Sequence, residues 1–388
     1  MPHQAMPHQS EHLQSSTTVT SAESPAPRRL RLGTAIAAAV AATTLMVAVP
    51  AQAEGPKKLD VASTFSTKNF LGAGAVRLAE ELKTATGGAV SLRVHEPGDL
   101  VPAFEVFNSV SSGAIQAGWD WMGYWAGTVP ITNLYGALPF GPSPEAFMSW
   151  MWAGEGTELV QAAYDPYGVK VLPCFISPQE TGGWYNKEIN TPEDFNGLSM
   201  RISGLGAKVL NKLGASTQLV PGSEIYLALE RGRVDATEFS VPQVDQAMGF
   251  NEVAKYYYFP GWHQSASWFS LLVNQEVWDS YSDERKAQFQ TACRATLQWA
   301  MAEAPPAQVK AIHELEAKGV QVKRFPEPVM TALQKAWAEV LEEEKKTNPD
   351  FAKAYDSLMK HAALIDEWYK LQAMPQPMAM KADEDASQ

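Results

Sequence analysis

An arginine inside an apolar segment carries the most chemical information in this sequence. Arg201 lies within residues 198–202, where the apolar pattern predicts a short buried strand. A buried arginine needs an anionic partner, because an unpaired charge away from water is costly. Its planar guanidinium matches a carboxylate with two parallel hydrogen bonds. Arg201 is therefore a candidate for binding a carboxylate ligand, and the alternative is a structural pair with an acidic side chain.

Two further side chains lie near the ends of predicted strands. Glu238 is close to the end of residues 234–239, where it can counter Arg201 or bind a hard cation such as Na⁺ or Ca²⁺. Such a cation needs several oxygen ligands, which a glutamine and backbone carbonyls can complete. Gln179 follows the predicted buried strand 169–176, and in open α/β sheets ligands bind at such carboxyl ends.

Aromatic residues gather in two stretches. Residues 119–125 hold four aromatic side chains, which is more bulk than packing at a strand end requires, so Tyr124 and Trp125 are candidates for the wall of a cleft. Residues 256–263 end with Trp262 and His263 beside a turn. The alternative for the first stretch is an aromatic cluster in the core. Both stretches favour a cleft that covers a small organic ligand.

The familiar catalytic patterns are missing from the sequence. There is no G-x-S-x-G elbow, no Walker loop and no EF-hand loop. His313 and Glu314 are not followed by the second histidine of a zinc-protease motif. The sequence therefore predicts a binding protein and no enzyme, although unpatterned carboxylates leave an enzyme acting on a carboxylate as an alternative.

The order of predicted elements indicates the fold class. Strand, helix and strand alternate over residues 59–121 and again over residues 169–239, which predicts two α/β lobes with parallel strands. From residue 282 the chain becomes mostly helical, with an interruption expected at Pro305 and Pro306. We expect a two-lobed α/β fold that closes on a ligand in the cleft between the lobes, with a long C-terminal helical region.

The N-terminus has the pattern of an export signal. Arg28, Arg29 and Arg31 precede an apolar run over residues 32–49, and Ala51-Gln52-Ala53 supplies small residues at a cleavage site. We expect cleavage after Ala53 and a periplasmic location, with a single membrane anchor as the alternative. The paired arginines leave the twin-arginine route open beside the general one.

Composition and cysteine content narrow the function further. The chain has 388 residues and a formal net charge of −12, without a basic stripe, so nucleic acid is not expected as a partner. Its apolar fraction of 45% excludes wholesale disorder. Cys174 and Cys293 would meet an oxidising compartment. Their separation does not decide whether they pair, and we expect two buried free thiols.

Several segments resemble one family across nearly the whole exported chain. They are "EPGDLVPAFEVFNSVSSGAIQAG" near residues 96–118, "ALPFG" at 137–141, "GGWYNKEINTPEDFNGLSMRISGLGAKVLNKLGA" at 182–215, "PGSEIYLALERGRVDATEF" at 221–239 and "VAKYYYFPGWH" at 253–263. The sequence resembles periplasmic substrate-binding proteins of TRAP transporters, DctP type. It is most similar to the branch that binds 2-oxo acids, or lactate in some relatives.

The resemblance implies roles for particular residues. Arg201 would pair with the ligand carboxylate, while Gln179 and Glu238 would hold a cation, Na⁺ or Ca²⁺, that bridges to the ligand. Phe239 stands where that branch usually has tryptophan, whose backbone carbonyl helps to bind the cation. The resemblance assigns the remaining ligand-binding positions to Tyr124, Trp125, Trp262 and His263.

The implied function is capture of a small monocarboxylate, such as pyruvate or lactate, for the membrane permease of a TRAP transporter. Because Phe239 changes the pocket wall, a polyol or a larger carboxylate is the nearest alternative, followed by a periplasmic sensor module. We assign lobe I to residues 54–178 with 264–306, and lobe II to 179–263 with 307–327. Residues 328–372 would form a long helix for homodimerisation, followed by a flexible tail over 373–388.

Overall fold

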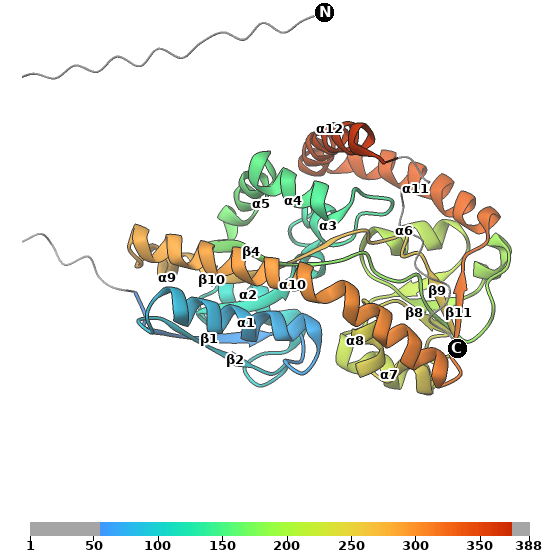
Figure 1. Ribbon diagram of the computed structural model, residues 1–388, viewed down its shortest axis with the longest axis horizontal. Helices are drawn as coiled ribbons and strands as arrows, with labels where there is room; N and C mark the ends of the chain where they lie inside the picture. The colour runs from blue at the N-terminus through green and yellow to red at the C-terminus, as the bar shows by residue number, and fades with distance from the viewer. Residues whose placement is uncertain (1–54, 375–388) are drawn as a thin grey trace, which may run out of the picture. The chain divides into compact units, whose positions relative to one another are not determined.

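The computed structural model describes residues 55–374. The predicted export signal over residues 1–53 therefore lies outside the described residues, as does nearly all of the predicted tail. The described part of the chain contains two β-sheets, each covered by helices (Figure 1).

The first sheet has five strands in the order β2-β1-β3-β10-β4. β1 pairs in parallel with β2 and with β3, as the strand–helix–strand alternation predicts, while β10 runs antiparallel between β3 and β4. The helix α1, Phe70–Ala85, connects β1 to β2. The strands are β1 (Lys58–Ser63), β2 (Ser91–His95), β3 (Ala117–Trp121), β4 (Val169–Ser177) and β10 (Ser267–Asn274).

The second sheet has six strands in the order β11-β9-β5-β8-β6-β7. β6 pairs in parallel with β7 and β8, which sets Arg201 beside Gln218 and Thr237. The strands are β5 (Gly183–Tyr185), β6 (Ser199–Arg201), β7 (Ser216–Gln218), β8 (Ala236–Thr237), β9 (Tyr256–Phe259) and β11 (Gln321–Arg324). The predicted two-lobed α/β fold is confirmed by these two sheets.

Short helices connect the strands within both sheets. None of the helices in the described part of the chain combines the length and the apolar character needed to cross a bilayer. The α-helices are α2 (Val106–Ser111), α3 (Thr132–Gly136), α4 (Pro144–Ala153), α5 (Gly156–Tyr164), α6 (Gly204–Lys212), α7 (Gly222–Glu230), α8 (Pro242–Ala247) and α9 (Gln275–Asp279). The 3-10 helices are Ala103–Glu105, Met122–Trp125, Asp165–Tyr167, Pro192–Phe195 and Phe250–Glu252.

The longest helix, α10, runs unbroken over Asp283–Ala317. The interruption expected at Pro305 and Pro306 is wrong, although each proline removes a backbone donor at a cost of about 3 kcal/mol. The helix packs on both sides of the prolines: against α1 and β4 of the first sheet, and against α8 and β11 of the second (Figure 1). Tertiary packing thus overrides the local helix-breaking preference.

The predicted long C-terminal helix is two helices, α11 (Glu327–Thr347) and α12 (Pro349–Gln372). The break falls at Asn348, because Pro349 favours the first position of a new helix and the side chain of Asn348 accepts a hydrogen bond from the Phe351 amide at 3.1 Å. α11 packs on α6, while α12 packs on α3, α4 and α5. The predicted long C-terminal helical region is therefore confirmed, and it is divided into two helices at Asn348.

Cys174 on β4 and Cys293 on α10 form a disulfide bond. The expectation of two free thiols was wrong. A separation of 119 positions carries no information about distance in space, whereas the direct packing of α10 on β4 brings the two sulfur atoms together. The bond ties a strand of the first sheet to the first half of the long helix.

Candidate functional site

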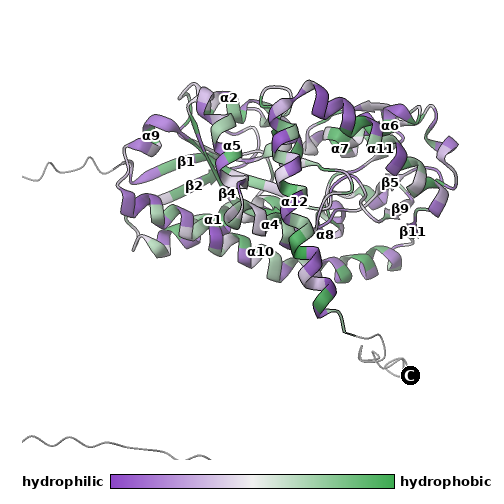
Figure 2. Cartoon of the chain, turned by 90° about the horizontal axis from the view of Figure 1, so that it is seen from above, coloured by the Kyte–Doolittle hydropathy of each residue, from purple (hydrophilic) through white to green (hydrophobic). Residues whose placement is uncertain are grey.

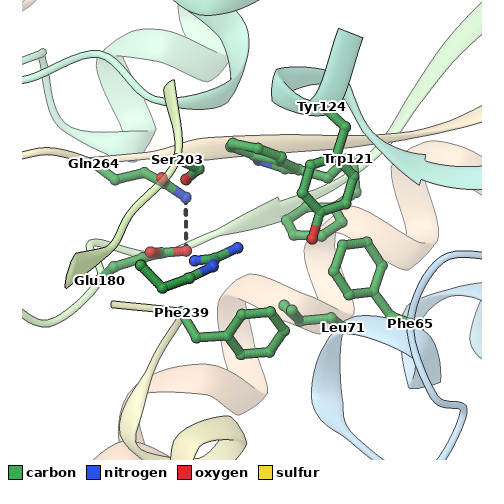
Figure 3. Close-up of a pocket in the computed structure, with 10 residues that line it drawn as sticks. Phe65, Leu71, Trp121, Tyr124, Glu180, Ser203, Phe239 and Gln264 are labelled. Carbon is green, nitrogen blue, oxygen red and sulfur yellow. Dashed lines mark hydrogen bonds between the residues drawn. The ribbon is translucent and has the colours of Figure 1, made fainter. Parts of the chain in front are cut away.

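A small cavity lies between the two sheets. Residues of β3, of β10 and of the loops beside the first sheet line part of it, and Arg201 at the end of β6 lines the rest together with residues that follow β4, β6 and β8 (Figure 3). The lining is largely aromatic, with a few polar side chains. It comprises Phe65, Leu71, Trp121, Tyr124, Glu180, Arg201, Ser203, Phe239, Gln264 and Phe269.

Arg201, at the end of β6, is only 2% exposed. Its Nη1 donates to the Glu238 carboxylate at 2.7 Å and to the Glu238 carbonyl at 2.8 Å, and its Nε donates to the Val220 carbonyl at 3.2 Å. No acceptor within residues 55–374 takes a hydrogen bond from Nη2. Arg201 thus has an acidic partner in the protein and keeps one donor group for a ligand in the cavity.

Glu238 is held as a carboxylate. Its Oε1 accepts from Arg201, from the Ser203 amide at 2.7 Å and from the Ser203 hydroxyl at 3.0 Å. Burial raises the pKa of Glu238, but the positive charges of Arg201 and His263 outweigh it and lower the pKa to about 2. These contacts fix Oε1 and leave Oε2 facing His263.

Glu180 and His263 lie on two segments in direct contact. The Glu180 amide donates to the Gln264 carbonyl at 3.1 Å, and a Cβ on Gly261 would lie 2.1 Å from the Glu180 carbonyl oxygen, so only glycine allows this approach. Gln264 also donates from Nε2 to Glu180 Oε1 at 2.6 Å (Figure 3). Glu180 Oε2 has no hydrogen-bond partner among the described residues.

The imidazole of His263 faces both buried carboxylates. Its Nε2 is 3.6 Å from Glu180 Oε2 and 3.6 Å from Glu238 Oε2, too far for a direct hydrogen bond. Burial lowers the pKa of His263, but the two carboxylates more than offset it and raise the pKa above its usual range. Burial raises the pKa of Glu180.

One ligand atom from each of Glu180, Glu238 and His263 lies within 4.8 Å of the other two. Two carboxylates and an imidazole are donors that protein-bound cations use. The buried Oε2 of Glu180, which lacks a protein partner, supports the same use. The residues present therefore fit a bound cation at this cluster.

The structure does not bring Gln179 into the cluster. This side chain is exposed, and its Nε2 donates to the Gly261 carbonyl at 3.2 Å. Successive residues of an extended chain point to opposite sides, so Glu180 faces inward where Gln179 was expected. The signal for Glu180 was present in the sequence, as an acidic residue directly after Gln179 beyond a buried strand.

Tyr124 and Phe239 lie at the cavity as expected. Tyr124 stacks on Phe65 with ring centroids 5.9 Å apart and meets Trp121 edge-on at 4.9 Å (Figure 3). Burial raises the pKa of Tyr124 well above its usual value. The ring of Phe239 lies 5.4 Å from the guanidinium carbon of Arg201. These rings make the apolar wall, and the metal role of the Phe239 carbonyl stays a prediction.

Glu238 and His263 lie beside the lining residues Arg201 and Glu180 but do not line the cavity themselves. Trp125 and Trp262 are not part of the lining either. Trp125 packs on Phe107 and donates from Nε1 to the buried carboxylate of Asp120, so it belongs to the core. Trp262 packs against the rings of Phe140 and His263. Sequence reasoning did not single out the other lining residues, namely Phe65, Leu71, Trp121, Ser203, Gln264 and Phe269.

Comparison with known proteins gives one family. The DctP model, described as bacterial extracellular solute-binding protein, family 7, matches residues 61–347. A monocarboxylate 2-oxoacid-binding periplasmic protein of Nostoc sp. is 30% identical over 298 residues, which is 77% of this chain and 82% of the relative.

Two solved structures show the same architecture. A TRAP periplasmic solute-binding protein from Colwellia psychrerythraea, with bound calcium and pyruvate, is 32% identical with a TM-score of 0.77, covering 81% of this chain and 96% of that one. A TRAP periplasmic solute-binding protein from Pseudoalteromonas atlantica, with bound sodium and pyruvate, is 30% identical with a TM-score of 0.77, covering 82% and 99%.

Proposed function

The chain belongs to the DctP family of bacterial extracellular solute-binding proteins, and from that premise we propose that it captures a small monocarboxylate for a TRAP membrane permease. The ligand is a 2-oxo or 2-hydroxy acid such as pyruvate or lactate. The observation that carries this proposal is the buried Arg201, which keeps an unused donor group at a small, aromatic-lined cavity. The 2-oxoacid relative and the two pyruvate-bound structures support the same ligand class.

The size and the lining of the cavity favour a short acid. Five of its ten lining residues are aromatic, and their rings leave little free space between them. Phe65, Tyr124 and Phe239 exclude water from the site, which strengthens each polar contact made there. Arg201 would then hold the carboxylate, and Ser203 and Gln264 offer further polar contacts. A ligand with a long chain would need to displace these rings.

Glu180 and Glu238 are the residues that would hold a cation in this site. The two relatives with bound pyruvate carry calcium or sodium. The bound cation would supply positive charge that offsets two carboxylates beside an anionic ligand. Arg201 is already paired with Glu238, so a cation held by Glu180 would add positive charge beside an anionic ligand and favour the charged form of the Glu180 carboxyl. Removal of the cation is accordingly expected to weaken acid binding.

Binding and release would be coupled to the movement of two lobes, which we place at residues 54–178 with 264–306 and at 179–263 with 307–327. The cavity takes residues from both sheets, so an acid bound there contacts both lobes at once. The closed form would then be the shape that the permease recognises. We place the protein in the periplasm after cleavage behind Ala53, acting by binding and not by catalysis.

A panel of ligands tests this function. Pyruvate, lactate, longer 2-oxo acids, dicarboxylates and polyols would each be added with Na⁺, with Ca²⁺ or with neither, and the melting temperature recorded. A ligand present at 100 times its Kd stabilises the folded state by about 2.7 kcal/mol, which is a rise of about 4 °C or more. We expect this rise with short 2-oxo or 2-hydroxy acids. A rise with a polyol or a dicarboxylate and none with short monocarboxylates would contradict the proposal, and consumption of the acid would indicate an enzyme.

We infer that the protein forms a homodimer through α12. Leu364, Trp368 and Leu371 follow one another at helical spacing and are 61%, 58% and 75% exposed. Figure 2 shows green, hydrophobic segments between purple ones along the last turns of α12. An exposed apolar stripe of this kind is typical of a protein interface. A second copy would cover it with the same stripe, as two-fold symmetry requires.

The molar mass of the protein in solution tests whether α12 forms the dimer. Light scattering coupled to size exclusion is expected to give twice the chain mass for the wild type and the chain mass for the double variant Trp368→Glu/Leu371→Glu. Val309→Glu is the matched control, because Val309 is also an exposed apolar residue on a helix but lies on α10. A monomeric wild type, or a control that dissociates equally, would disprove the role of α12.

A further inference from the structure

We propose that Gln264 makes the cavity prefer a 2-hydroxy acid over the matching 2-oxo acid, with lactate and pyruvate as the test pair. This inference rests on the proposed function and deepens it, because it identifies which of the two classes of acid binds more tightly. The observation behind it is a buried amide oxygen of a lining residue that has no hydrogen-bond partner among the described residues.

The amide group of Gln264 offers an acceptor and no free donor. Its Nε2 donates to Glu180 Oε1 at 2.6 Å and to Ser267 Oγ at 2.9 Å, which uses both amide hydrogens. Its Oε1 is buried and accepts no hydrogen bond from residues 55–374. The side chain is 2% exposed and lines the cavity, so a ligand held there is the group that can supply the missing donor.

The contacts of Ser267 determine which atom of the amide is the oxygen. The Ser267 hydroxyl donates to the Gly136 carbonyl at 2.9 Å, so it has no hydrogen left for Gln264 and must accept from it. The indole of Trp121 donates to the same hydroxyl oxygen. The opposite orientation of the amide would also set its oxygen against a carboxyl oxygen of Glu180. These contacts therefore hold Oε1 as the atom without a partner.

The two classes of acid differ in what they can give to this oxygen. The hydroxyl of a 2-hydroxy acid can donate to Gln264 Oε1, whereas the carbonyl of a 2-oxo acid only accepts and would meet oxygen with oxygen. A buried acceptor that stays unpaired is costly. A site that binds a ligand hydroxyl through such a group discriminates strongly against the analogue that lacks the hydrogen. Gln264 therefore favours the hydroxy acid.

The other polar groups of the cavity serve both acids. The free donor group of Arg201 would bind the carboxylate, which lactate and pyruvate share. The Tyr124 hydroxyl can donate or accept, so it fits either ligand. Glu180 Oε2 is the other buried oxygen of the lining without a partner, and a cation held by Glu180 and Glu238 would occupy it. Gln264 Oε1 is then the group that still requires a donor from the ligand.

A fixed acceptor also selects one mirror form of the hydroxy acid. Figure 3 shows Gln264 and Glu180 on one side of the drawn residues and the rings of Tyr124 and Phe65 on the other. With the carboxylate on Arg201 and the methyl group against the rings, the hydroxyl of only one enantiomer of lactate is directed to Gln264. We expect the affinities of the two enantiomers to differ at least tenfold.

The test is calorimetric titration of D-lactate, L-lactate and pyruvate into the wild-type protein, in one buffer and with one cation. We expect the better lactate enantiomer to bind at least tenfold more tightly than pyruvate. The variant Gln264→Met keeps the length of the side chain without its acceptor, and it is expected to lose at least tenfold in affinity for that lactate and less than threefold for pyruvate. Gln290→Met is the matched control, because Gln290 is an exposed glutamine on α10 that does not line the cavity, and it should keep the wild-type ratio of affinities.

The ratio of affinities separates a role in specificity from a merely structural one. The contact of Gln264 with Glu180 acts on both acids alike, so equal losses for lactate and pyruvate in Gln264→Met would overturn the inference. Pyruvate binding as tight as that of both lactates in the wild type, or equal affinities of the two enantiomers, would overturn it as well and leave the proposed function in place. This wild-type comparison holds even where the variant does not fold. Binding of none of the three acids would refute the proposed function, and the inference with it.

Discussion

Replacing Arg201 by alanine is expected to weaken binding of a short acid by a factor on the order of 10²–10³, the range that follows from losing one side of a buried charge pair. Two effects act together. The ligand carboxylate loses its only cationic side chain among the residues that line the cavity, and Glu238 loses the group that most strongly lowers its pKa. Titration calorimetry with pyruvate measures the loss.

The structural role of Arg201 has to be separated from its ligand role. The double variant Arg201→Met/Glu238→Gln removes both charges, so no unpaired charge remains buried and folding is expected to recover. Acid binding is not expected to recover with it. Arg233→Ala serves as the control, since the Arg233 side chain is exposed and, among the described residues, donates a hydrogen bond only to Gln218. Binding by Arg201→Ala within tenfold of the wild type would remove the arginine from the site.

The second large effect concerns stability. The double variant Cys174→Ala/Cys293→Ala is expected to lose about 2–5 kcal/mol of unfolding free energy. The bond closes a loop of 119 positions, and a cross-link of that span greatly restricts the unfolded chain. Urea unfolding of the oxidised wild type and the variant gives the difference directly, provided that both unfold in a single step.

Reduced wild-type protein is the control for this double variant, because it lacks the disulfide bond but keeps both cysteine side chains. Its stability should match that of the double variant to within the packing cost of two small side chains. Free thiol in the denatured, unreduced wild type would contradict the bond itself. A loss under about 1 kcal/mol would mean that the unfolded chain is already restricted without it.

Sequence patterns predicted the fold where local periodicity and chain order agree. The alternation of strands and helices gave two α/β lobes, and the helical pattern gave the C-terminal region. The patterns failed where contacts between distant parts of the chain determine the structure. The helix α10 continues through Pro305 and Pro306 because both of its halves pack on other elements. Cys174 and Cys293 form a disulfide bond because β4 and α10 pack together.

The same division applies to the site. Arg201 and Glu238 could be predicted, since a charged residue within a buried strand needs a partner wherever it lies. Glu180 could not be separated from Gln179, because the direction of a side chain after the end of β4 depends on the loop that follows. The prediction that Trp125 lines the cavity was wrong, because the aromatic content of the segment does not reveal that the Trp125 indole donates a hydrogen bond to the buried Asp120.

The continuous helix α10 also has a mechanical consequence. Its first half is anchored to the first sheet through packing and a covalent bond, and its second half rests on α8 and β11 of the second. Any motion that separates the sheets must then either bend α10 or break the packing contacts of one half of this helix. Pro305 and Pro306 sit between the two anchored halves and lack the amide hydrogens that stiffen a helix. Opening of the cleft is therefore expected to bend α10 at Pro305 and Pro306, between its two anchored halves.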